Sequence, residues 1–498
     1  MADSTLNQAK QLRRVSTGIA ALDKILQGGL PGGEIYVVNG APGTGKTIFA
    51  LHFLSAGAAA GEKVLCIALS QQVDSILQTA VSVNIDASKI IFRGLSSAEA
   101  IQQLAERQTI FDTSEIELEN TMTSLTQLIE KIQPERVVFD GISYLRLLAS
   151  NPLLYRQQLL ILRDYLAQRD VTVLLTDTQE LVRGDQELVA IAHGVITLST
   201  AATTYETHRR YLHVRKIRGS GYQPGYHDLE ISDQGMQVYP TLWKPRFQTN
   251  GYEQIITSGL EGLDVLVGGG LLAGTSCLLV GPSGTGKTST ATLFANNFMR
   301  QGGKVSVFLF DELIHTLLRR SAGLNMDVVS FVDRDQLRLY ELSLNQITPG
   351  KLVQMVKQDI DKWGAKIVII DTLTGYFSAM PSEKYLIAQM HELLLFLSRR
   401  GILSFLVVAQ HGVVGPNLEV PVDISYLADT VLLLRHFEAN GGLRQAISVY
   451  KKRYGSHEKR IRELRFDANG IQIGEPLSQF TGILSGAPSY VGESQNLM

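Results

Sequence analysis

Two copies of one eight-residue loop are the residues of this sequence best suited to chemistry. The pattern G-x-x-x-x-G-K-T fills residues 40–47 and again residues 281–288, each directly after a short apolar run. Its glycines let backbone N–H groups wrap phosphate oxygens, its lysine reaches the terminal phosphates, and its threonine hydroxyl binds Mg²⁺. The helix expected after each loop adds the partial positive charge of its N-terminus. The predicted ATP-binding residues are Gly43, Thr44, Gly45, Lys46 and Thr47, and Gly284, Thr285, Gly286, Lys287 and Thr288.

A carboxylate that could complete each metal site follows downstream of its loop. Asp140 ends the run VVFD, and Asp371 ends the run IVIID. Proteins with this loop commonly hold Mg²⁺ between the loop threonine and an aspartate at the end of another strand. An aspartate there is often only a turn former or a helix N-cap, but its recurrence beside both loops favours the metal role. The predicted metal ligands are Thr47 and Asp140, and Thr288 and Asp371.

The elements around the loops repeat as well. Residues 16–47 align without a gap with residues 257–288, so the chain is a duplication. Apolar, β-branched runs alternate with helical patterns in both halves, which predicts an α/β fold of two tandem domains, each a mainly parallel twisted sheet with helices on both faces. The expected strands include residues 63–69, 136–140 and 171–176, and residues 304–310, 366–371 and 402–409.

A linker is expected between the halves. Residues 239–254, YPTLWKPRFQTNGYEQ, contain two prolines and no sustained periodicity, so we place the boundary near Lys244. The predicted organisation is an N-terminal tail over residues 1–14, domains over residues 15–244 and 245–485, and a short tail over residues 486–498.

Composition narrows the environment of the protein. The net charge of −2 over 498 residues provides no general attraction to nucleic acid or to an anionic membrane. Neither a signal-peptide pattern nor an apolar run of about 20 residues is present. Cys66 and Cys277 each lie in an apolar run and are expected to be core residues. We therefore expect a cytoplasmic protein that does not bind membranes.

The segment ahead of each loop, S/T-G-hydrophobic-x-x-L-D-x-hydrophobic-x-x-G-G-L, resembles the KaiC branch of the RecA-like ATPases, and the similarity extends from about residue 15 to about residue 490. VRKIRGSGY and VYKKRYGSH resemble the Lys-x-Arg element of that family. The resemblance implies that Lys216 and Arg218, or Lys451 and Arg453, reach the ATP of a neighbouring subunit, in a homo-oligomer that is a hexameric ring. A fixed cation there would stabilise charge during phosphoryl transfer. Alternatively, these residues form a solvated face, or residues 451–465 contact nucleic acid.

The two halves differ at the residues that could activate an attacking oxygen. Asp311 and Glu312 follow the expected strand 305–310 and resemble the family's pair of glutamates, which implies that they provide the base. Alternatively, they are a solvated acidic pair at a helix start. The first half has Ser70 and Gln71 there, so we expect it to bind ATP and to hydrolyse it poorly. The predicted catalytic residues are Asp311, Glu312, Lys287, Lys451 and Arg453.

A predicted phosphate acceptor is also confined to the second half. Family members phosphorylate themselves on an adjacent Ser-Thr pair, and Ser425 and Tyr426 stand at that pair here, whereas Val189 and Ala190 stand there in the first half. We expect Ser425 to be the acceptor, because the phenol of Tyr426 is bulkier and its oxygen projects farther from the backbone. The alternative is that Ser425 is an ordinary loop hydroxyl.

These features favour a KaiC-like ATPase and serine autokinase that acts as an oligomeric regulatory or timing switch, with ATP and Mg²⁺ as cofactors. Two other functions stay open: a RecA/RadA-like DNA-dependent ATPase, and a nucleotide-dependent scaffold with little turnover. No zinc-knuckle or helix-hairpin-helix pattern supports the first of these. A KaiB-like partner is compatible with the resemblance, while the short segment after FTGILSGAPSYV argues against regulation by a KaiA-like activator.

Overall fold

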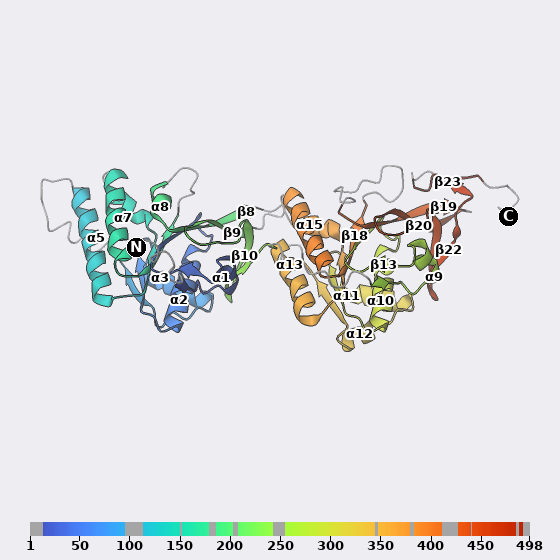
Figure 1. Ribbon diagram of the computed structural model, residues 1–498, viewed down its shortest axis with the longest axis horizontal. Helices are drawn as coiled ribbons and strands as arrows, with labels where there is room; N and C mark the ends of the chain where they lie inside the picture. Colours follow the sequence, from blue (N-terminus) through green and yellow to red (C-terminus); the bar gives the residue numbers. More distant parts are fainter. Residues whose placement is uncertain are drawn as a thin grey trace, which may run out of the picture. The chain divides into compact units, whose positions relative to one another are not determined.

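The computed structural model describes residues 13–94, 113–149, 152–178, 186–202, 208–242, 254–343, 347–378, 383–410, 427–439, 441–484 and 488–491. The chain divides into two compact units near Thr241 (Figure 1). The boundary predicted near Lys244 lies outside the described residues. Both units are α/β domains built on a large sheet, which confirms the predicted fold of tandem RecA-like domains.

The elements of the N-terminal domain follow the expected alternation. Its strands are β1 (Arg14–Val15), β2 (Leu30–Pro31), β3 (Ile35–Asn39), β4 (Val64–Ala68), β5 (Ile91–Gly94), β6 (Arg136–Asp140), β7 (Thr172–Asp177), β8 (Gly194–Ala202), β9 (His208–Ile217), β10 (Tyr226–Ser232) and β11 (Gly235–Tyr239). Its helices are α1 (Ala20–Ile25), α2 (Lys46–Ala59), α3 (Val73–Ser82), α5 (Thr113–Ile132), α6 (Ser143–Leu147), α7 (Pro152–Ala167) and α8 (Gln186–Ile191).

The C-terminal domain repeats this order. Its strands are β12 (Ile255–Ile256), β13 (Leu271–Leu272), β14 (Ser276–Gly281), β15 (Val305–Leu309), β16 (Leu337–Glu341), β17 (Ile367–Asp371), β18 (Leu403–Ala409), β19 (Thr430–Ala439), β20 (Gly442–Lys452), β21 (Arg462–Asp467), β22 (Gly470–Pro476), β23 (Phe480–Thr481) and β24 (Ser489–Tyr490). Its helices are α9 (Glu261–Leu266), α10 (Lys287–Arg300), α11 (Ile314–Gly323), α12 (Val329–Asp333), α13 (Pro349–Gln358), the π-helical turn η1 (Asp359–Trp363), α14 (Leu373–Ser378) and α15 (Glu383–Arg399).

The main sheets of the two domains have the same topology. Within the described residues, the strand order is β11-β10-β9-β8-β3-β7-β6-β4-β5 in the first and β22-β21-β20-β19-β14-β18-β17-β15-β16 in the second. From β8 to β5, and from β19 to β16, neighbouring strands are parallel. The remaining strands add an antiparallel extension. The parallel strands therefore end at one edge, which is where ligands bind in open α/β sheets.

Helices cover both faces of each sheet, so the central strands are buried throughout. All five residues of β3, β4 and β17 are buried, as expected for parallel strands that read as continuous apolar runs. Along β3, Val38 packs in one core with residues of α2, whereas Val37 packs on the opposite face with residues of α5 and α7. Figure 1 shows α2 on one side of this sheet and α5 and α7 on the other. In the part of the chain that the structure describes, no helix is both long and apolar enough to cross a bilayer.

Candidate functional site

Each glycine-rich loop connects the central strand of its sheet to the helix after it. Residues 40–47 join β3 to α2, and residues 281–288 join β14 to α10. Gly45 and Gly286 precede the helices in the left-handed conformation, with φ values of 104° and 91°. An L side chain rarely adopts such a φ, so these two positions require glycine. A Cβ at Gly286 would also lie 2.0 Å from the ring of Phe466.

The loop lysines point into their own loops. The Lys46 ammonium donates to the carbonyl oxygens of Gly40 and Ala41, at 2.7 and 2.9 Å, and Lys287 donates to the carbonyl of Pro282 at 2.6 Å. Burial lowers the pKa of both ammonium groups, that of Lys287 to about 8. Both lysines therefore lie where backbone atoms of the loop cradle phosphate oxygens.

The predicted metal ligands lie together in both domains. In the first, the Thr47 hydroxyl donates to Asp140 Oδ2 at 3.1 Å, and Thr176 donates to Asp140 Oδ1 at 2.6 Å. In the second, burial raises the pKa of Asp371 to about 6, an effect opposed by the Thr288 hydroxyl. One oxygen of this 4% exposed carboxylate has no hydrogen-bond partner within the described residues. A buried carboxylate oxygen beside a loop threonine suits Mg²⁺, a hard cation that prefers oxygen ligands.

The acidic pair of the second domain lies next to this metal-binding aspartate. Glu312 is close enough to Asp371 to raise the pKa of that carboxyl further. Asp311 accepts a hydrogen bond from Thr372, the residue after Asp371. The carboxylates just after β15 and the one that ends β17 therefore face the same edge of the sheet, as expected for adjacent parallel strands.

The corresponding residues of the first domain form neutral hydrogen bonds. Gln71 donates from its amide nitrogen to the Thr47 hydroxyl at 3.3 Å, and Ser70 lies 3.5 Å from the backbone carbonyl of Asp140. Two polar groups not anticipated from the sequence also lie at this edge. Asn39 and Asp177 are each 1% exposed, and the Thr197 hydroxyl donates to Asn39 at 2.8 Å.

Arg320 is a residue of the second site that sequence reasoning missed. Two of its guanidinium nitrogens donate to the two carboxylate oxygens of Glu312, one of them at 2.9 Å. The signal was present in the sequence, because Arg320 lies two turns into the helix that starts just after Glu312. Thr176 and Thr372 were missed as well, since nothing in their local sequence marks them.

The Lys-x-Arg residues have partners within their own domains. Lys216 and Arg218 donate to the carbonyl oxygens of Val189 and Ala190, at 2.6 and 2.8 Å. In the second domain, Lys451 donates to the carbonyl of Ala428 at 3.0 Å, and Arg453 pairs with Asp429 at 3.3 Å. Both elements therefore contact the segment just before β8 or β19. Ser425 and Tyr426 lie outside the described residues.

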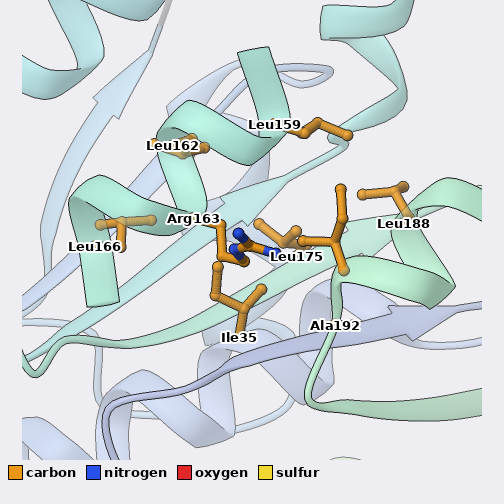
Figure 2. A pocket seen from close by; sticks show the side chains of 9 residues that line it. Ile35, Leu159, Leu162, Arg163, Leu166, Leu175, Leu188 and Ala192 are labelled. Carbon is orange, nitrogen blue, oxygen red and sulfur yellow. The ribbon is translucent and has the colours of Figure 1, made fainter. Parts of the chain in front are cut away.

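An apolar pocket of the first domain lies away from this edge. Figure 2 shows Leu159, Leu162 and Leu166 of α7 facing Ile35 of β3 and Leu175 of β7. These side chains belong to the face of the sheet opposite α2, the helix that the loop leads into. The pocket is thus part of the packing between helix and sheet, separate from the phosphate-binding loop.

Comparison with known proteins agrees with this geometry. The model of the KaiC ATPase family matches residues 15–242 and again residues 256–478. The circadian clock oscillator protein KaiC of Acaryochloris marina is 25% identical, over 99% of this chain and 95% of its own length. The circadian clock protein KaiC3 of Synechocystis is 27% identical, over 97% of this chain and 96% of its own length.

Proposed function

This chain belongs to the KaiC family of ATPases, and from that premise we propose that its C-terminal domain is the catalytic half, a combined ATPase and serine autokinase. The N-terminal domain binds ATP mainly as a structural ligand. The protein works as a homo-oligomeric ring with ATP at its subunit interfaces. Its phosphorylation state is the output of a regulatory switch, an assignment supported by the clock-protein names of its relatives.

The proposed division of catalytic and binding roles between the domains rests on one difference. Glu312 lies beside Asp371 in the second site, whereas the first site has Gln71 at that position, hydrogen-bonded to Thr47. A carboxylate can orient an attacking oxygen and accept its proton, and a general base of this kind contributes about 10²- to 10⁴-fold to a rate. A neutral amide cannot take the proton. The first site has the residues for binding, but it lacks a carboxylate at the position of the base.

The roles of the other residues are assigned from their positions. Thr288 and Asp371 would hold Mg²⁺, which offsets negative charge on the phosphates when bound. Lys287 binds the terminal phosphate oxygens, and Glu312 accepts a proton from water or from a serine hydroxyl. In the transfer to serine, the bond between the γ-phosphorus and the bridging oxygen of ATP breaks, ADP leaves, and a new bond joins phosphorus to the serine oxygen.

We propose Ser425 as that acceptor, facing ATP held by the Lys287 and Thr288 of an adjacent subunit. Lys451 and Arg453 would balance charge at that ATP. Support comes from their contacts with Ala428 and Asp429, the two residues that directly precede β19.

The test is to incubate the full chain with Mg²⁺ and γ-labelled ATP, with and without single-stranded DNA. We expect phosphate release and label in the protein, both independent of DNA. Stimulation by DNA would identify a DNA-dependent ATPase instead, and an absence of release and label would identify a scaffold.

Phosphopeptide mapping then tests the acceptor. Phosphate on Ser425 should disappear in Ser425→Ala and in Lys287→Ala, while Tyr426→Phe should keep it. Phosphate found only at other residues would refute the assignment of Ser425 and leave the ATPase unaffected.

A further inference from the structure

We propose that Arg320 is a positioning residue that holds the carboxylate of Glu312 in its working orientation. This inference rests on the proposed function, in which Glu312 activates the attacking oxygen. It assigns to Arg320 a role that neither the loop motif nor the acidic pair requires.

Arg320 and Glu312 form a bidentate ion pair. Both carboxylate oxygens of Glu312 accept hydrogen bonds from the guanidinium of Arg320. The Glu312 side chain is 18% exposed and the Arg320 side chain is 33% exposed. Paired bonds of this kind fix the plane of a carboxylate as well as its position. Each oxygen keeps a second lone-pair site, so Glu312 can still accept a proton from an oxygen that approaches from the solvent side.

The helix that carries Arg320 is anchored on both sides of this residue. Leu317 and Ser321 of α11 are buried, and the Ser321 hydroxyl donates to the carbonyl of Leu317 at 2.8 Å. Glu312, in contrast, lies in the short connection between β15 and α11. A flexible side chain on a loop is thereby tied to a packed helix, which is how a reacting group is kept close to its productive geometry.

Charge gives a second reason for an arginine at this place. Asp311, Glu312 and Asp371 gather at one edge, and like charges at short range destabilise one another. Arg320 places a permanent positive charge in contact with one of the three. The ion pair with Arg320 thereby offsets the repulsion between Glu312 and Asp371 and keeps Glu312 in place.

The first domain provides a natural comparison, because it lacks both members of the pair. Gln71 stands where Glu312 stands, and Thr79 occupies in α3 the position of Arg320 in α11. The Thr79 hydroxyl is exposed and donates to the carbonyl of Ser75 in its own helix. In these two domains the arginine and the carboxylate are therefore present together or absent together, as expected if one acts through the other.

The test uses the full chain with Arg320→Ala and Arg320→Lys, and with Arg319→Ala as a matched control. Arg319 is exposed and precedes Arg320 on the same helix, so its removal changes the net charge equally. We expect Arg320→Ala to lower kcat for ATP hydrolysis by about 10- to 100-fold, a part of the whole effect of a general base, with KM for ATP changed less than about twofold. Arg320→Lys should recover part of the rate, and Arg319→Ala should keep all of it.

A double variant separates positioning from structural support. If Arg320 acts through Glu312, adding Arg320→Ala to Glu312→Gln should change the remaining rate by less than about twofold, since non-additivity marks residues that act as a unit. If Arg320→Ala lowers the rate equally in the wild-type chain and in Glu312→Gln, the role of Arg320 is refuted. It is also refuted if Arg320→Ala leaves the rate unchanged or makes it faster. Either result leaves the assignment of Glu312 as the base intact. Unchanged turnover in Glu312→Gln would overturn the assignment of the base, and this inference with it.

Discussion

The two nucleotide sites share their loop, lysine, threonine and strand-end aspartate, but they differ in the residues just after β4 and β15. In the first site, Gln71, Thr47 and Asp140 form a chain of hydrogen bonds. In the second, Glu312 and Arg320 form an ion pair beside the aspartate. In the function proposed above, the loop residues provide binding, and the residues at the end of another strand decide whether binding can lead to chemistry.

The ends of the central strands differ too. Asn39 and Asp177 are in register on β3 and β7, and the same two positions of β14 and β18 are Val280 and Val408. Asp177, together with Asp140, favours the charged form of Lys46 and opposes the effect of burial on its pKa. Two carboxylates of the first site therefore lie near Lys46 and favour its charged form.

The largest effect is expected from removing the base of the second site. Glu312→Gln should lower ATP turnover and self-phosphorylation by about 10²- to 10⁴-fold, because the amide cannot accept a proton. Nucleotide binding and oligomerisation should be retained, since the loop is unchanged. Measured phosphate release, labelling and size-exclusion profiles check this, and the matched control is Gln71→Asn in the first site. Equal loss in the control would contradict the division of labour.

Moving the pair of Glu312 and Arg320 into the first site tests whether these two residues account for the difference between the sites. In a Lys287→Ala background, which disables the second site, Gln71→Glu with Thr79→Arg should raise the residual turnover by about 10-fold, the lower part of the range for a positioned base. Gln71→Glu alone should give less, because its carboxylate lacks the arginine. If the double variant is no faster than the background, features other than the pair must account for the difference between the sites.

The two sites should also respond differently to alkaline pH. Phosphate binding needs a charged lysine, so ATP affinity at the second site should fall as pH rises above about 8, where Lys287 loses its proton. Affinity there should also fall below about pH 6, where protonation of Asp371 removes its charge for Mg²⁺. Fluorescent-nucleotide titrations of Lys46→Ala and Lys287→Ala, each with one intact site, report the two sites separately. We expect the first site to keep its affinity to higher pH, and matching profiles would contradict this.

The last prediction concerns stability rather than rate, at the glycines before the helices. Alanine at Gly45 or Gly286 must take a left-handed conformation, which costs about 1–2 kcal/mol. At Gly286 the added Cβ also displaces the Phe466 ring, whereas at Gly45 it meets the flexible end of Ile231. Gly286→Ala should therefore cost about 1–3 kcal/mol more, a usual penalty for overpacking. Hydrogen exchange of α2 and α10 without nucleotide checks this, with Gly43→Ala as a control that carries only the backbone cost.

Local sequence was sufficient to predict the elements that hold the loops. The run 136–140 is the strand β6 itself, and the run 366–371 differs from β17 by one residue. Such strands are buried on both faces, so an unbroken apolar run marks them clearly. The loops were equally visible, because their glycines and lysine are required by backbone geometry and phosphate charge.

Contacts across the sheet edge were harder to foresee. Thr176 reaches Asp140 only because β6 and β7 pair in one particular register, and Arg320 reaches Glu312 only through the orientation of α11. Neither partner belongs to a motif. The roles assigned to Ser425, Lys451 and Arg453 stay predictions, since they concern contacts with a neighbouring subunit.

The order of the strands has a consequence for biosynthesis. β3, which leads into the first loop, lies between β7 and β8, and these begin only at Thr172 and Gly194. The first loop is thus synthesised early, but the strands on either side of β3 are synthesised late. The first domain is complete near Thr241, before the second loop at residues 281–288 is made. Since domains tend to fold as units during synthesis, ATP can bind the first domain while the second is still being made. A ligand at 100 times its Kd stabilises a fold by about 2.7 kcal/mol, so slow hydrolysis in the first domain would let ATP act as a lasting aid to folding.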